Sequence, residues 1–195
     1  KQTTIGFTLF FSMFSVVFLT GEILQEKEEK TWYRLLTAPV SKTALLGANL
    51  LTAFFVGLIQ VIFLVVLSAY LFHIDWGRNL LGVFIVIAAY VFSMTAIGMF
   101  LTSILKTKAQ LQTITPVLLV STSMLGGAYW PLEIIESKLL LTLAQLTPQR
   151  WAMEPIKQMV MYGYDIQVII KPTLILLAMG LTWFILGLKM LRFEN

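Results

Sequence analysis

The sequence contains no cysteine and a single histidine, His73. Without cysteine there is no disulfide framework and no thiolate metal site, and one histidine excludes a histidine cluster. Charged residues are also scarce, at 12% of the chain, whereas a typical soluble domain carries about 25%. Hydrophobic residues reach 58%, and the mean hydropathy is +0.85. This composition excludes an ordinary soluble domain and indicates an integral membrane protein.

Catalytic motifs are missing as well. The sequence has no glycine-rich phosphate-binding loop with its lysine, so we do not expect the chain to hydrolyse ATP, and it has no His-Glu-x-x-His pattern. Serines of the apolar segments, such as Ser93 and Ser103, lack a His or Asp partner, and serines there usually serve helix packing. The formal net charge of +4 fits a membrane protein with basic loops and does not require nucleic acid. We therefore expect a non-enzyme with no catalytic, metal or cofactor site of its own.

Long apolar runs dominate what is present. A helix needs about 20 apolar residues to cross a bilayer, and five segments have an uncharged apolar core of this kind: about 3–20, 43–72, 80–105, 111–130 and 172–188. The predicted fold class is therefore all-α. We expect one transmembrane domain over residues 1–195, a polytopic helical bundle that passes through the cytoplasmic membrane several times and is surrounded by lipid.

A charged segment, residues 22–42, separates the first two apolar runs. From Glu22 to Leu36 it has no Pro or Gly and many helix-forming residues, and Pro39 then ends the helix. Trp32 and Tyr33 are suited to the depth of the lipid headgroups. Such a helix on a membrane surface favours a binding element, and the alternative is a solvated linker between two spans. Its charged residues are Glu22, Glu26, Lys27, Glu28, Glu29, Lys30, Arg34 and Lys42.

The distribution of Lys and Arg predicts an orientation. If residues 22–42 are cytoplasmic, then residues 106–110 and 189–195 are too, and these segments are denser in basic residues than residues 1–2, 73–79 and 131–171 on the other side. The sequence begins with Lys1 rather than an initiator methionine, and five spans place this start outside. We therefore expect upstream sequence with at least one further span.

Residues 131–171 are too polar to span a membrane and too apolar for a free loop. A first amphipathic helix is predicted up to Pro148, and a second over Trp151–Tyr162, ending at Gly163. The pair follows a bend at Gly126–Pro131. It forms either a re-entrant hairpin in the outer leaflet, where non-helical backbone must be buried in protein or face water, or two helices lying flat on the surface. The apolar positions of the first helix are Leu132, Ile134, Ile135, Leu139, Leu140, Leu143 and Leu146.

Polar side chains within the spans are candidates for a transport pathway, because they face neighbouring helices or a cavity rather than lipid. For each of them the alternative is a hydrogen bond between helices. The phenylalanines of the first span form a dimer interface, an apolar lining of the pathway, or a contact with lipid. Since no charge lies inside a span, an amphipathic or lipid-like cargo fits better than a bare ion. The pathway candidates are Gln60, Ser93, Thr95, Thr113, Thr115, Ser121, Thr122 and Ser123.

Two stretches carry a resemblance to a known family. Glu26–Ser41, EKEEKTWYRLLTAPVS, resembles the charged element of the ABC type-2 permeases, the membrane subunits of one class of ATP-binding-cassette exporters. Lys30, Tyr33 and Ala38 depart from the residues usual there. Gly126–Glu154 resembles the closing region of the same family. It has a Gly-rich helix end, Trp130, Pro131 and Leu132, then Leu146, Thr147 and Pro148, and finally Trp151 and Glu154. The resemblance covers the whole chain, and only the family's first span and the following extracellular region are absent.

This resemblance implies a six-span subunit that pairs with a second, identical or related, permease subunit. Two cytosolic ATPase subunits, which bind ATP and magnesium, lie beneath the pair. The charged helix is the coupling element that seats in a groove on the ATPase. The cargo is expected to be a drug, an antibiotic or a lipid-linked glycan. The implied coupling residues are Glu22, Glu26, Lys27, Glu28, Glu29, Lys30, Thr31, Arg34 and Pro39, and the re-entrant region contains Trp130, Pro131, Pro148, Trp151 and Glu154.

Two other functions remain open from the sequence alone. A membrane scaffold or assembly protein would use the charged segment to bind a partner that is not an ATPase. A channel would need a constriction lined by charges or carbonyl groups, and the sequence offers no candidate for one. Association with an ATPase distinguishes the transporter from the scaffold.

Overall fold

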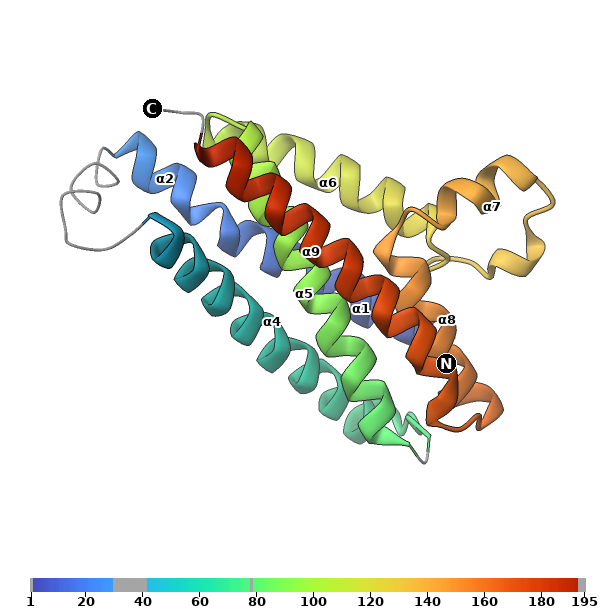
Figure 1. Ribbon diagram of the computed structural model, residues 1–195. Helices are drawn as coiled ribbons and strands as arrows, with labels where there is room; N and C mark the ends of the chain where they lie inside the picture. Colours follow the sequence, from blue (N-terminus) through green and yellow to red (C-terminus); the bar gives the residue numbers. More distant parts are fainter. Residues whose placement is uncertain (1, 30–41, 78, 193–195) are drawn as a thin grey trace.

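The computed structural model describes residues 2–29, 42–77 and 79–192. Its regular elements are all helical, which confirms the predicted fold class (Figure 1). The α-helices are α1 (Gln2–Thr20), α2 (Glu22–Glu28), α4 (Lys42–Phe72), α5 (Leu80–Ile104), α6 (Lys108–Leu125), α7 (Lys138–Ala144), α8 (Pro148–Tyr162) and α9 (Ile170–Arg192). Two 3-10 helices are η1 (Leu132–Ile134) and η2 (Ile166–Ile169).

Within the described residues, four helical segments are long and apolar enough to cross a membrane: Gln2–Glu26, Gly47–Leu71, Leu80–Ile104 and Ile166–Met190. They match four of the five predicted spans. The fifth, expected at 111–130, corresponds to α6, which begins at Lys108 and ends at Leu125. Its glutamines, threonines and serines reduce its apolarity. With 18 residues it is about 27 Å long, close to the thickness of a bilayer core, so this span stays a prediction.

Helices α1 and α5 form the centre of the bundle. In the apolar segment of each of these two helices, 61% of the residues are buried inside the protein. The corresponding shares are 22% for the apolar segment of α4 and 17% for that of α9. Helix α4 packs on both central helices, α6 packs beside α1, and α9 runs along α5 (Figure 1). Two glycines of α9 allow its close approach to α5, since an added Cβ would lie 2.6 Å from the Phe92 ring at Gly180 and 3.4 Å from the Phe100 backbone at Gly187. The outer faces of α4 and α9 therefore remain apolar and exposed.

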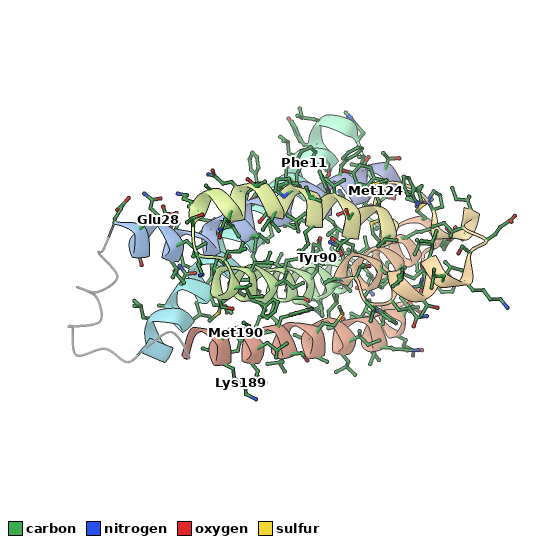
Figure 2. All side chains as sticks on the ribbon, turned by 90° about the horizontal axis from the view of Figure 1, so that it is seen from above. Phe11, Glu28, Tyr90, Met124, Lys189 and Met190 are labelled. Atoms are coloured by element: carbon green, nitrogen blue, oxygen red, sulfur yellow. The ribbon has the colours of Figure 1, made fainter. Side chains whose placement is uncertain are left out.

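A methionine sulfur joins four helices inside the bundle. Met13 Sδ of α1 lies 3.2 Å from the Tyr90 hydroxyl of α5, 3.4 Å from Gln149 Nε2 of α8 and 3.8 Å from Ser123 Oγ of α6. All four side chains are buried, and Figure 2 shows Tyr90 near the centre of the bundle. Because a thioether is only a weak acceptor, the donors also use other oxygens. This cluster fixes α6 and α8 against the two central helices.

The predicted cytoplasmic segments gather at one end of the bundle. Ile23 of α2 packs with Leu50 of α4 and Met99 of α5, and with Leu45 and Leu188 around them. The other segments meet at the opposite end, where the backbone of Met159 in α8 lies 3.0 Å from a Cβ placed on Gly77. The described residues of these segments thus fall into the two groups that the distribution of basic residues predicted. Which group faces the cytoplasm stays a prediction.

The region 131–171 differs in detail from the sequence prediction. The first amphipathic helix is divided into η1 and α7, because Ile135 and Ser137 between them have extended backbones. Tertiary contacts hold η1 apart: the side chain of Leu132 packs against Gly127, and Glu133 forms an ion pair with Lys157. The prediction of a single helix over this stretch was therefore wrong.

The second helix of this region, α8, begins at Pro148 rather than Trp151, since proline suits the first turn of a helix. It packs against α1, α5 and α9 and buries Ala152, Met153 and Ile156. Helix α7 stands off from the bundle (Figure 1) and exposes leucines. The burial of α8 shows that this helix packs against the bundle, and both alternatives, re-entrant or flat on the surface, stay predictions.

Candidate functional site

The charged segment begins as a short helix, α2, that continues α1 after a turn at Gly21. Gly21 is needed for close packing, because an added Cβ would lie 2.1 Å from Leu111 Cδ2 of α6. In α2 the apolar Ile23 and Leu24 are buried, whereas Glu22 and Glu28 are exposed. The helix is therefore seated on the bundle by its apolar side and presents carboxylates outward, and Figure 2 shows Glu28 near the far end of α2.

Helix α2 is bound to the first turn of α6. The backbone N–H of Lys108 donates to Glu28 Oε1 at 2.9 Å, and the Lys108 ammonium donates to Gln25. Gln25 in turn donates to Glu29 Oε1 at 2.7 Å. A carboxylate at the N-terminus of a helix is favoured by unpaired backbone N–H groups and by the helix dipole. The acidic helix and the basic turn at 106–110 thus form one surface, which we call the α2–α6 surface and define as residues 22–29 and 106–110.

The structure describes only part of the predicted coupling set. Glu28 and Glu29 are exposed and Glu26 is partly buried, and all three are on or next to α2. Lys27 is on the same helix. The remaining candidates, Lys30, Thr31, Arg34 and Pro39, lie outside the described residues. Sequence reasoning did not identify Gln25 and Lys108 as partners in this surface, although the basic turn had been assigned to the same side.

The pathway candidates differ in their hydrogen bonds and in their exposure. Gln60 donates to Ser15 Oγ at 3.0 Å, Thr95 bonds within α5, and Ser123 belongs to the Met13 cluster. Thr122 accepts from Gln149 at 3.0 Å. These contacts agree with the packing alternative. Ser93 and Thr115 are buried, and their hydroxyls have no hydrogen-bond partner among the described residues.

Only Thr113 and Ser121 of these candidates are exposed on α6. They share the outward side of the helix with Val117, which is 68% exposed, and Met124. Helix α6 packs beside α1, whose aromatic ridge begins with Phe7 and Phe11, stacked on one another and 41% and 57% exposed. Phe14 and Phe18 follow along the same helix, with their rings in a tilted contact. Figure 2 shows Phe11 and Met190 on opposite sides of the molecule. The ridge and the exposed side of α6 form a mixed aromatic and hydroxyl surface.

At the opposite end, the predicted re-entrant residues are held by specific contacts. Pro148 is buried at the start of α8, and Trp151 Nε1 donates to the Gln145 carbonyl at 2.8 Å. Trp130 lies beside Tyr129, with ring centroids 6.4 Å apart, and Pro131 precedes η1. Glu154 is exposed and accepts from Gln158. Pro148, Trp151 and Glu154 thus belong to the first two turns of α8, whereas Trp130 and Pro131 belong to the segment before η1.

An ion pair ties η1 to α8 in this region. Lys157 is 6% exposed and its ammonium contacts Glu133. The hydrogen bond from Lys157 is the main cause that lowers the pKa of the Glu133 carboxyl. Burial by itself lowers the pKa of the Lys157 ammonium, but the hydrogen bond and charge of Glu133, together with the charges of Tyr162 and Glu154, outweigh it and raise this pKa. Both groups are thus charged at neutral pH.

In the part of the chain that the structure describes, no three His, Asp or Glu side chains lie close enough to hold a metal ion. The fold is that of a multi-pass helical membrane protein with polar surfaces at both ends. A family model described as ABC-2 family transporter protein matches residues 1–189. The chain therefore belongs to the ABC-2 family of membrane permeases, as the resemblance of residues 26–41 and 126–154 predicted. Such permeases are membrane-transport subunits that are not themselves enzymes.

A curated relative supports this membership. The chain is 32% identical over 187 residues to the linearmycin resistance permease protein LnrN of Bacillus subtilis (strain 168). The alignment covers 96% of this chain and 48% of the relative, so the chain spans about half the length of that protein. No solved structure matches the chain significantly. The family assignment fits a protein of the cytoplasmic membrane and does not favour the scaffold alternative.

Proposed function

We propose that this chain is part of the membrane-spanning subunit of an ATP-binding-cassette exporter that moves an amphipathic or lipid-like compound across the cytoplasmic membrane. The energy comes from separate cytosolic ATPase subunits, which bind ATP and magnesium and dock on residues 22–42. The observation that carries this proposal is the α2–α6 surface, where Glu28 is bonded to the start of α6 in a chain of the ABC-2 family. The printed name of the relative, a resistance permease, supports efflux of a toxic compound such as an antibiotic.

The α2–α6 surface is placed to transmit motion. A force on α2 reaches α1 through the turn at Gly21 and reaches α6 through Lys108. Helix α1 is central in the bundle, and the Met13 cluster connects it to α5, α6 and α8. Because packed interfaces move as rigid units rather than deform continuously, closure of the ATPases shifts α1 and α6 together. This places the moving helices next to the surface proposed for transport.

The transport surface that we propose is the aromatic ridge of α1 with the exposed side of α6. Its phenylalanines offer apolar contact, and Thr113 and Ser121 offer hydroxyl groups. The described spans place no charge along it, which suits an amphiphile better than an ion. A second permease subunit, identical or related, faces this surface and closes the pathway.

Bulky substitutions distinguish this surface from lipid contact. We expect Ser121→Trp and Thr113→Trp to reduce export at least about tenfold, because an indole fills space that the cargo crosses. The measurement is ATP-dependent export from cells or vesicles that hold the full-length permease and its ATPase. Leu174→Trp and Leu181→Trp, at exposed positions of α9, are matched controls that keep export. Equal loss at α6 and α9, or no loss at α6, contradicts the proposed pathway.

The proposed orientation has a direct test, since the chain contains no cysteine. We expect Lys106→Cys and Lys108→Cys to react with a membrane-impermeant maleimide in inside-out vesicles only. Asp75→Cys, at the other end of the bundle, should react with the same maleimide in intact cells from which any barrier outside the cytoplasmic membrane has been removed. The reverse pattern would place α2 outside and exclude docking to a cytosolic ATPase.

A further inference from the structure

The start of α8 lies near the middle of the bundle. Gln149 Nε2 is 3.4 Å from Met13 Sδ, and the hydroxyl of Tyr90 is 3.2 Å from the same sulfur. Met13 follows the first residue of α1 by eleven residues, and Tyr90 follows the first residue of α5 by ten. At 1.5 Å per residue, both helices place Gln149 about 15 Å from the bundle end opposite α2. This depth is half of the ~30 Å hydrocarbon core of a bilayer.

The other end of α8 returns to the bundle end opposite α2. The carbonyl oxygen of Met159 lies 3.0 Å from a Cβ placed on Gly77, and its sulfur lies 2.8 Å from a Cβ placed on Gly82 in the first turn of α5. Met159 follows Gln149 by ten residues, which is about 15 Å of helix. Because this length equals the depth of Gln149, α8 runs lengthwise along the bundle, beside α9 (Figure 1), and not across its end.

Two non-helical turns meet close to the depth of the α8 start, residues 126–128 after α6 and residues 145–147 before α8. A Cβ placed on Gly126 would lie 2.9 Å from Thr147 Oγ1. An unpaired N–H group in hydrocarbon is costly, so non-helical backbone there must be paired inside the protein. The N–H groups of 126–128 donate to carbonyls in the last turn of α6, and those of 145–147 donate to carbonyls in the last turn of α7. The next residue, Pro148, has no N–H group. Both turns therefore meet the condition for backbone inside a membrane.

Residues 138–147, which we call the α7 arm, have the composition of a segment that lies in hydrocarbon. No residue between Lys138 and Arg150 is charged. Leu139 and Leu146 are each 71% exposed, and Figure 1 shows α7 standing off from the bundle. The exposed charge of Lys138 is at the first residue of the arm, where a lysine reaches the lipid headgroups. The arm is therefore polar at its start and apolar toward the turn beside α8.

We propose that α7 and α8 form a hairpin that enters the bilayer from the end opposite α2 and turns near its middle. The exposed leucines of the α7 arm then contact the acyl chains of that leaflet. The depth is measured from the helix ends of this chain alone. The proposal therefore depends on neither the orientation nor the transport function proposed above.

Acyl chains fit the α7 arm better than water or a second copy of the chain does. Water would cover an uncharged, leucine-rich segment at a large hydrophobic cost. A protein partner would cover one face of the helix, whereas Ala144 is the only buried residue of α7. Exposure of so much of the helix surface suits a fluid apolar solvent.

Depth-dependent fluorescence quenching tests this placement. Leu139→Cys and Leu146→Cys, each as the only cysteine of the full-length permease, carry a bimane label in liposomes. The liposomes contain phosphatidylcholine with a nitroxide on the headgroup, on acyl carbon 5 or on acyl carbon 12. We expect the carbon-12 nitroxide to quench position 146 at least about twofold more than the headgroup nitroxide does, because this position lies inside the hydrocarbon core. Position 139 should respond most to the carbon-5 nitroxide, since it is nearer to the headgroups.

Leu181→Cys and Tyr164→Cys are matched controls for depth. Leu181 is 52% exposed and follows the first residue of α9 by eleven residues, which is about 16 Å of helix. It should show the quenching profile of the bilayer centre. Tyr164 is exposed in the turn between α8 and η2 and should respond most to the headgroup nitroxide. Leu143→Cys, also exposed on α7, replaces a labelled variant whose melting curve shows loss of folding.

Two results overturn the proposal. If positions 139 and 146 both show the profile of position 164, the α7 arm lies flat on the membrane surface. If no lipid nitroxide quenches position 146 while position 181 responds, the arm is covered by water or by a second copy of the chain. Quenching by aqueous iodide then identifies water. Export does not enter the measurement, so neither result bears on the transport proposal.

Discussion

Charge reversal on α2, as Glu28→Lys with Glu29→Lys, is expected to reduce association with the ATPase by about 100-fold or more. The two carboxylates are exposed, so they are available to basic residues of a partner. Removing one member of a buried, hydrogen-bonded charge pair costs about 2–5 kcal/mol, and reversal adds repulsion. Glu28 also bonds to Lys108, so reversal loosens α2 from α6. Co-purification of the ATPase from native membranes measures the effect.

A matched double variant controls for net charge. Glu136→Lys with Asp165→Lys reverses two exposed carboxylates at the opposite end of the bundle and should leave co-purification unchanged. Membrane insertion and yield should be the same for both double variants. If Glu28→Lys with Glu29→Lys retains the ATPase as well as the unaltered chain does, the coupling role of α2 is wrong.

The second large effect is expected from Gly6→Ala in α1. A Cβ at this position would lie 1.9 Å from the carbonyl oxygen of Ala128, which is backbone and cannot rotate away. Helix α1 and the turn after α6 must separate, and overpacking of this kind costs about 1–3 kcal/mol. We expect the apparent melting midpoint of the purified protein to fall by about 5 °C. Export should fall with it, because α1 and the turn frame the transport surface.

Gly47→Ala in α4 is the control for Gly6→Ala. A Cβ there meets no atom within 4 Å, and alanine is favoured over glycine within a helix by about 1 kcal/mol. The melting midpoint should therefore stay the same or rise. A stable Gly6→Ala variant with full activity would mean that α1 does not pack against the turn as closely as the structure indicates.

The sequence predicted the features that depend on hydropathy. Four spans, the helical class and the grouping of the loops at two ends follow from apolar length and from the positions of Lys and Arg. Helix α6 was harder, because its apolarity is moderate and its end at Leu125 depends on the close packing of Gly126 against Thr147 and Gln149. Contacts between residues distant in sequence decide such a boundary, and they leave no local signal.

For the candidate sites too, local patterns in the sequence were informative, whereas contacts between distant residues could not be predicted. The local pattern of carboxylates identified Glu28, but its partner Lys108 is 80 positions away and had been noted only as part of a basic turn. Conversely, Ser123 and Gln60 were pathway candidates because they are polar, and the structure engages both in contacts between helices. Polarity in a span does not tell which side chains have a partner in another helix, since Ser93 and Thr115 have no hydrogen-bond partner among the described residues.

Site-specific crosslinking from α2 tests the central claim most directly. A photoreactive amino acid at position 29, which is exposed at the end of α2, is introduced into the full-length permease and irradiated in native membranes. The account predicts one major adduct with an ATP-binding-cassette ATPase, and loss of that adduct when the photoreactive residue is moved to position 136 at the opposite end. An adduct with an extracellular protein, or no ATPase adduct from position 29, would contradict it.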